Sequence, residues 1–262
     1  ISLQKASKIP KAMEALNGEW TKLENQRWWL IETVRENADV VADAKTNGAT
    51  VHFATLMQLT HIKHSELTPD KHKYKGRIVF RGDQVRDESG YLAGFSEQGT
   101  SASHMAAAKM LDAISRLDDC DGEDADAAST YTQSLLGGPE TWVALPRDRQ
   151  PASWANFREP VCRLRLSLYG HLLAGLYWEQ RSRKHILACG FAPVKGWECL
   201  YLHPTKQPLL SIYVDDFKMA GLKRNIAPVW ASLRKYINLD PPVPLHGDVS
   251  LGCGQSNVPP PP

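Results

Sequence analysis

Apolar residues recur at helical spacing along several stretches of the chain. Ala12, Met13, Leu16, Trp20 and Leu23 repeat in this way, and Pro10 suits a first helical turn. The same criterion predicts four further helices, over residues 36–46, 101–117, 170–189 and 227–237.

Short apolar or β-branched runs between these helices predict strands. They cover residues 28–31, 71–81, 142–146, 161–166, 199–203 and 209–214. Residues 50–67 fit either a strand or a helix, and residues 118–126 are acidic enough to predict a loop. Because strands and helices do not alternate regularly, the pattern favours an α+β fold.

Residues 209–221 are the most informative stretch. An apolar run reaches the adjacent pair Asp215 and Asp216, and a second apolar run then leaves and ends at Gly221. Two such runs predict a hairpin with the acidic pair at its turn. Adjacent carboxylates repel each other, so a fold that presents them commonly supplies a divalent cation. The simpler interpretation is an acidic turn, since Asp118 and Asp119 form a second pair.

The most basic segment, residues 71–81, alternates cations with apolar residues. This pattern indicates a strand with one charged face, on which Lys75 and Arg77 lie, and a merely solvated face explains it equally well. The nearby His61, His64 and His72 could be metal ligands, but solvent-exposed histidines on a basic loop are the better interpretation.

Composition adds few constraints. The net charge of +2 argues neither for nor against a polyanionic partner. No stretch approaches the roughly 20 apolar residues of a membrane span, and the start of the chain lacks a signal-peptide core, so we expect no membrane partner. The five cysteines are odd in number and never spaced as C-x-x-C, which favours free thiols in a reducing, intracellular compartment.

Four short motifs occur in a characteristic order. They are Tyr-Lys-Gly-Arg-Ile-Val at 74–79, Val-Cys-Arg-Leu at 161–164, Ser-Leu-Tyr-Gly at 167–170 and Tyr-Val-Asp-Asp at 213–216. Together they make the chain resemble the reverse transcriptase domain of copia-type long-terminal-repeat retrotransposons. The family has alanine where this chain has Gly76. After Tyr169-Gly170 it has Lys-Gln and then Ala-Pro, which this chain lacks.

The resemblance implies the fingers and palm of a right-hand polymerase. A central antiparallel sheet would carry the Tyr-Val-Asp-Asp hairpin, with helices on one face. The implied divisions are a tail over 1–11, the fingers and palm over 12–221, the palm end and start of the thumb over 222–258, and a polyproline tail over 259–262. The implied activity is RNA-directed DNA synthesis by a fragment of a Gag-Pol-type polyprotein. Its location would be a cytoplasmic particle or the nucleus.

The family also requires a third, upstream carboxylate, followed four and five residues later by Ala-Phe. The candidates for this position are Asp118, Asp119, Asp121, Asp124 and Asp126. Asp126 is followed at those positions by Thr130 and Tyr131, whereas Asp124 is followed by Ala128 and Ser129. The aromatic ring favours Asp126, and Asp124 stays open as the alternative. The residues before Asp126 are acidic and polar, where the family has an apolar strand.

The resemblance assigns roles to these residues. Two Mg²⁺ ions, which Mn²⁺ could replace, would be held by Asp126, Asp215 and the Ala127 carbonyl, with Asp216 as a weaker ligand. The deoxynucleoside triphosphate would contact Lys75, Arg77, Tyr131 and Tyr213, and Tyr131 would exclude a 2′-hydroxyl unless it is an ordinary half-buried aromatic. An RNA or DNA template with its primer would contact Tyr169, Gly170, Leu251 and Gly252.

Two other functions remain open from the sequence. One is a noncatalytic, decayed or domesticated fragment that binds nucleic acid. The other is a different palm-type phosphoryl-transfer enzyme, such as a nucleotidyl cyclase or another polymerase, which would share two-metal chemistry but would not require these motifs in this order.

Overall fold

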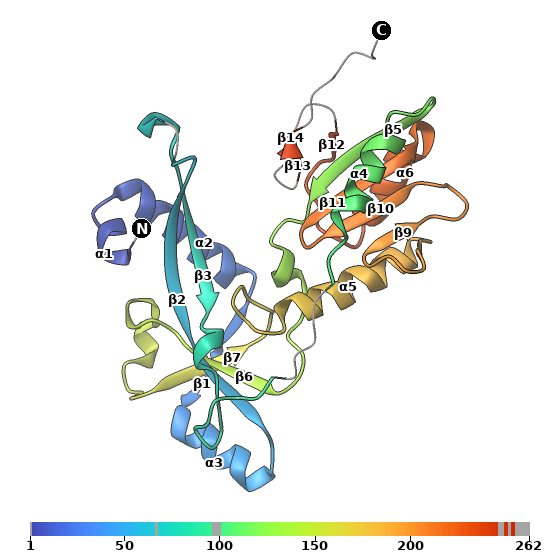
Figure 1. Cartoon of the computed structure of the whole chain (residues 1–262). Coiled ribbons are helices and arrows are strands. Elements are labelled where there is room, and N and C mark those ends of the chain that lie inside the picture. The colour runs from blue at the N-terminus through green and yellow to red at the C-terminus, as the bar shows by residue number, and fades with distance from the viewer. Residues whose placement is uncertain (1, 66–67, 96–100, 246–248, 251–252, 255–262) are drawn as a thin grey trace. The chain divides into compact units, whose positions relative to one another are not determined.

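The computed structural model describes residues 2–65, 68–95, 101–245, 249–250 and 253–254. The chain divides into two units (Figure 1). Unit 1 comprises residues 1–98 and 134–177, and unit 2 comprises residues 99–133 and 178–262. Each unit contains helices and a β-sheet, so the fold is α+β, as the sequence predicts.

Unit 1 is built on a six-stranded sheet with the order β1-β7-β6-β2-β3, in which β4 also pairs with β2. The strands β2 and β6 run parallel, and the other pairs are antiparallel. The strands are β1 (Trp29–Glu36), β2 (Val51–Lys63), β3 (Lys73–Phe80), β4 (Arg86–Asp87), β6 (Glu140–Ala144) and β7 (Pro160–Leu164). The helices of this unit are α1 (Leu3–Ala6), α2 (Pro10–Asn25) and α3 (Asn37–Asn47).

Helix α2 packs directly on the basic strand β3. Its buried stripe of Leu16, Trp20 and Leu23 belongs to the core of unit 1. At Gly76 the two backbones come so close that a Cβ would lie 2.6 Å from the Cα of Leu16. A side chain at position 76 would therefore push α2 away from the sheet, which accounts for glycine at this position.

Unit 2 is built on a fully antiparallel six-stranded sheet with the order β12-β5-β11-β10-β9-β8. The strands are β5 (Cys120–Asp126), β8 (Ala192–Pro193), β9 (Leu200–Leu202), β10 (Leu209–Tyr213), β11 (Asp216–Leu222) and β12 (Val243–Pro244). A separate pair is formed by β13 (Val249–Ser250) and β14 (Cys253–Gly254). The helices are α4 (Met105–Ile114), α6 (Lys223–Leu233) and most of α5 (Ala174–Ala188), because the division between the units falls after Tyr177.

The acidic segment is a strand, so the prediction of a loop over residues 118–126 is wrong for residues 120–126. Strand β5 pairs with β11 along its whole length and with β12 on its other side. Its buried positions are Gly122 and Ala125, and only Ala125 contributes a side chain to the apolar core. Pairing on both edges thus overrides the low strand propensity of Asp and Glu.

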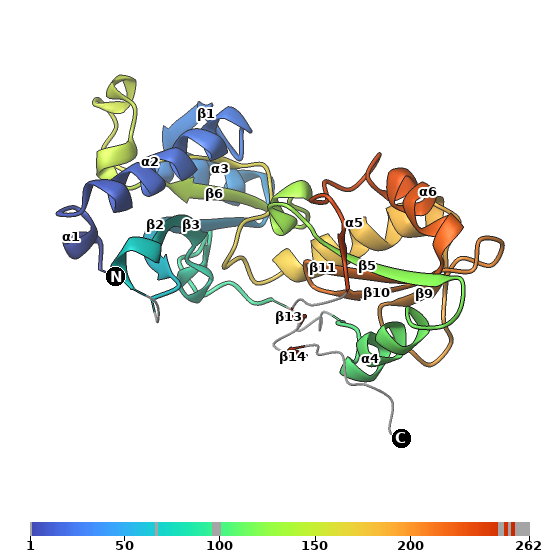
Figure 2. The same cartoon turned by 90° about the horizontal axis from the view of Figure 1, so that it is seen from above.

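Helices cover both faces of the sheet in unit 2, so the expectation that they lie on one face is wrong. Figure 2 shows α5 and α6 on one side of this sheet and α4 on the other. The cause is visible in β11, where side chains alternate between faces. Phe217 and Met219 join the core cluster shared with α5 and α6, whereas Ala220 packs against Ala107 and Leu111 of α4.

Several boundaries differ from the sequence predictions. The helix predicted over 101–117 is the shorter α4, and the helix predicted over 227–237 is α6, which begins and ends four residues earlier. The helix predicted from residue 170 begins at Ala174, after a turn in which Gly170 has φ of 90°. Residues 1–11, expected as a tail, contain α1 and the first residues of α2. Within the described residues, no helix has both the length and the apolar character that crossing a membrane requires.

Candidate carboxylate site

The pairing of β5 with β11 places two of the predicted site residues face to face. Asp126 is the cross-strand partner of Asp216, at the end of both strands. Tyr213 is opposite Asp216 on the other side, and Asp215 lies in the two-residue connection between β10 and β11. Asp124 is opposite Lys218 instead. The register therefore brings Asp126, rather than Asp124, against the Asp215-Asp216 pair.

The turn that carries Asp215 has a strained backbone. Val214 has φ of 58°, in the left-handed region that a β-branched residue rarely adopts. Hydrogen bonds hold both turn carbonyls, because the indole Nε1–H of Trp178 donates to the Val214 carbonyl at 2.8 Å and the Ala127 N–H donates to the Asp215 carbonyl at 2.8 Å. These bonds fix the position of the turn relative to α5 and to the end of β5.

Sequence reasoning did not assign Trp178 to the site. Trp178 is 3% exposed, and its ring packs edge-on against Phe217 with the ring centroids 6.3 Å apart. The sequence shows only a tryptophan within a predicted helix. A buried tryptophan usually needs a hydrogen-bond acceptor for its indole N–H. The sequence does not show that this partner is the Val214 carbonyl.

The carboxylates repel one another electrostatically. Burial, followed by a side-chain hydrogen bond with Asp126 and by the charges of Asp126, Asp215 and Asp124, raises the pKa of Asp216 to about 7. A carboxyl group that keeps its proton near neutral pH is able to donate to its ionised neighbour. A cation at this position would favour the ionised form and replace that shared proton.

The donor set suits a hard divalent cation. Carboxylate and carbonyl oxygens are the ligands that Mg²⁺ prefers. The Ala127 carbonyl accepts a hydrogen bond from Thr130 Oγ1 at 2.8 Å and has a second lone pair. Among the described residues, no three His, Cys, Asp or Glu side chains are grouped as a metal-binding cluster, and Asp216 is hydrogen-bonded to Asp126. The oxygen donors are therefore of the chemical type that Mg²⁺ prefers. Binding an ion requires the hydrogen bond between Asp126 and Asp216 to break.

Two aromatic side chains border the carboxylates in sequence. Tyr131 lies in a short 3₁₀ turn, Thr130–Gln133, and packs half-buried against the cluster that contains Trp178 and Phe217. Tyr213 is 44% exposed at the end of β10. Tyr213 can therefore contact a ligand from solvent, and Tyr131 has both core contacts and an accessible part.

Unit 1 gathers a second set of predicted residues. Lys75 and Arg77 share one face of β3, and the guanidinium carbon of Arg77 lies 4.8 Å from the ring centroid of Tyr169. The Tyr169 carbonyl accepts a hydrogen bond from Phe80 N–H at 2.8 Å. A Cβ at Gly170 would lie 2.2 Å from the Phe80 carbonyl oxygen, which explains why this left-handed position is glycine.

The basic face of β3 continues onto β2. Opposite Lys75 lies His61, and opposite Lys73 lies Lys63. Partial burial, followed by the positive charges of Arg77 and Lys63, lowers the pKa of Lys75. Clustered cations of this kind are stabilised by a polyanion, so the face is suited to phosphate groups.

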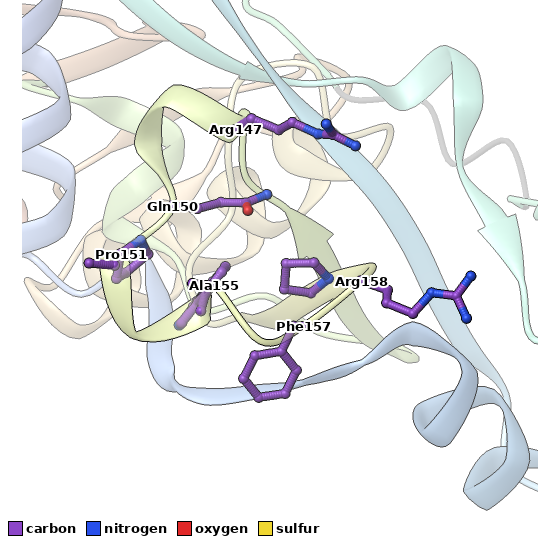
Figure 3. A pocket seen from close by; sticks show the side chains of 9 residues that line it. Arg147, Gln150, Pro151, Ala155, Phe157 and Arg158 are labelled. Atoms are coloured by element: carbon purple, nitrogen blue, oxygen red, sulfur yellow. The ribbon is translucent and has the colours of Figure 1, made fainter.

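A shallow hollow of about 450 Å³ lies in unit 1 in the connection between β6 and β7 (Figure 3). Its lining includes Gln150, Trp154 and Phe157, and Figure 3 shows Arg147 and Arg158 extending toward the same side of the view. None of the predicted site residues lines it. The predicted primer-side residues Leu251 and Gly252 lie outside the described residues.

A scan against protein-family models found no match for this chain. A search of curated proteins also found no match.

Proposed function

We propose that the chain is the polymerase part of a reverse transcriptase, which adds deoxynucleotides to a primer 3′-hydroxyl on an RNA or DNA template. The single observation that carries the proposal is the register of β5 with β11, in which Asp126 is opposite Asp216 beside the turn that holds Asp215. Carboxylates brought together from distant sequence positions on a strand pair are the arrangement that two-metal nucleotidyl transfer requires.

In this proposal each carboxylate has a role in holding divalent cations. Asp126 and Asp215 would be the principal ligands, the Ala127 carbonyl would add an oxygen donor, and Asp216 would be a weaker ligand. When bound, Mg²⁺ supplies activation of the attacking hydroxyl and stabilisation of the charge on the transferred phosphoryl group and pyrophosphate. The hydrogen bonds to the Val214 and Asp215 carbonyls support catalysis by keeping the turn in one place.

The resemblance also assigns a role to the basic face of unit 1. Lys75 and Arg77 would neutralise the triphosphate, with Arg77 able to form paired hydrogen bonds to its oxygens. Tyr169 keeps Arg77 in place through the ring contact described above. Tyr131 would lie beneath the deoxyribose and exclude a 2′-hydroxyl. In this reading unit 1 corresponds to the fingers, unit 2 to the palm, and the chain is part of a longer intracellular polyprotein.

The test is a primer-extension assay with Mg²⁺ on RNA and DNA templates, comparing Asp215→Asn with the control Asp119→Asn. Asp215→Asn keeps the side-chain size and removes a ligand charge, so extension should fall at least about a hundredfold, or on the order of 3 kcal/mol of barrier. Asp119 lies just before the opposite end of β5 and should tolerate the change. Equal losses in both variants would refute the site.

The same assay separates the other two functions. Binding of a primer–template without extension by the unmutated chain would indicate a noncatalytic nucleic-acid-binding protein. Turnover of a nucleoside triphosphate without a primer would indicate another palm-type phosphoryl-transfer enzyme.

A further inference from the structure

An ion pair between a buried lysine and a half-buried aspartate lies on the same face of the sheet as Asp126 and Asp216. Lys218 is 5% exposed, and its Nζ lies 2.6 Å from Oδ1 of Asp112 in α4. Because Lys218 follows Asp216 by two residues on β11, the two side chains point to the same face. The cross-strand partner of Lys218 is Asp124, two residues before Asp126.

Stability alone does not account for this pair. The lysine is removed from water almost completely and the aspartate, whose side chain is 31% exposed, only in part. This desolvation offsets much of their attraction, and well-packed apolar side chains of similar volume serve about as well. Apolar side chains on this face can pack against α4, because the neighbouring Ala220 packs against Ala107 and Leu111 of that helix. The position of the pair next to a group of carboxylates points to an electrostatic role.

We propose that the Lys218–Asp112 pair is a positioning pair that sets how tightly the adjacent carboxylate site binds a divalent cation. The inference rests on the proposed function and adds two residues to its site. Residues two apart on a strand are separated by roughly 7 Å, a range at which one partly buried charge changes the binding of a nearby cation about three- to tenfold. With both members present, their opposite charges largely cancel.

The proposal predicts opposite effects from removing the two charges. Lys218→Met leaves Asp112 as an additional negative charge near the site, so the dissociation constant for the cation should fall. Asp112→Asn removes a negative charge that faces Lys218, so the net positive charge near the site increases and the constant should rise. The double variant Lys218→Met/Asp112→Asn restores neutrality and should bind the cation about as the unmutated chain does.

The test is titration of the full chain with Mn²⁺, with free Mn²⁺ followed by electron paramagnetic resonance and the melting temperature recorded in parallel. We expect the Kd to fall about threefold or more in Lys218→Met and to rise by a similar factor in Asp112→Asn. Lys109→Met and Asp118→Asn make the same charge changes at exposed positions, on α4 and before β5, and should leave the Kd unchanged. Lys218→Arg keeps the charge and should also bind normally.

Two results would overturn the inference in distinguishable ways. If the pair only docks α4 on the sheet, both single variants lower the melting temperature and neither shifts the Kd, or both shift it in one direction. If the unmutated chain does not bind Mn²⁺, or if Asp215→Asn leaves its Mn²⁺ binding unchanged, the proposed function fails together with this inference. Should Lys218→Met not fold, Asp112→Asn and the double variant still decide the sign of the effect.

Discussion

The hydrogen bond from Trp178 to the Val214 carbonyl gives a direct test of how the site is held. Trp178→Phe keeps an aromatic ring in the core and removes only the N–H donor and part of the ring. The Val214 carbonyl then loses a partner in a partly buried turn, which costs about 1–3 kcal/mol. Left-handed φ at a β-branched residue stores a further ~1–3 kcal/mol of strain, which the turn can release once it is no longer held.

We therefore expect Trp178→Phe to lower the free energy of unfolding by about 2 kcal/mol and to reduce Mg²⁺-dependent extension more than that loss of stability explains. The matched control is Trp142→Phe, because the Nε1 of Trp142 is buried without a hydrogen-bond partner within the described residues. The measurements are urea unfolding and primer extension on the same preparations.

A double-mutant cycle isolates the role of the turn. Val214→Gly suits the left-handed conformation, so the turn no longer needs an external hydrogen bond to remain there. In that background Trp178→Phe should cost about 1 kcal/mol less than in the unmutated chain. If the cost is the same in both backgrounds, or if Trp178→Phe costs no more than Trp142→Phe, the hydrogen bond does not hold the turn and our account of the site's rigidity is wrong.

Two further predictions concern selectivity and pH. Tyr131→Val should increase ribonucleotide relative to deoxynucleotide incorporation while the metals stay bound, whereas an unchanged ratio in a protein destabilised by about 3–5 kcal/mol would assign Tyr131 to the core. Burial, and then the charge of His52, lowers the pKa of His171 to about 4, so the native state binds fewer protons than the unfolded state between pH 6.5 and 4. Stability should consequently fall by about 3 kcal/mol as pH drops through this window. The check is to measure the free energy of unfolding of the unmutated chain and of His171→Gln at pH 7 and pH 5. The same pH dependence in both proteins would contradict the assignment. Asp216 contributes a pH dependence of opposite sign, but it does so equally in both proteins.

The features that local sequence determines were predictable. The strands β10 and β11 follow from two apolar runs separated by two residues, because hairpin pairing depends on neighbouring residues. Helix α2 follows from a buried stripe at helical spacing. In these cases the hydrophobic pattern and the local propensity agree, and no distant contact is needed to decide between alternatives.

The features that depend on distant partners were not predictable. The acidic residues of β5 form a strand because β11, about ninety residues later, and β12 supply their hydrogen bonds. The glycine at position 76 is explained only by the approach of α2. The role of Trp178 depends on which carbonyl its indole reaches, and that depends on how α5 packs against the hairpin. Each of these is a property of the assembled unit.

The polar contacts between α4 and the sheet also bear on why the carboxylates meet. Ser211 Oγ donates to Ser103 Oγ, just before α4, at 2.6 Å, and Lys218 pairs with Asp112 of α4. The face of β10 and β11 toward α4 therefore carries polar groups whose partners lie in this helix and in the segment before it. A register slip of one residue would reverse the faces of a strand and place Lys218 in the apolar cluster with α5 and α6. An unpaired buried ammonium there would cost several kcal/mol. The same pair that we propose to tune cation binding thus also penalises the registers in which Asp126 would not lie opposite Asp216.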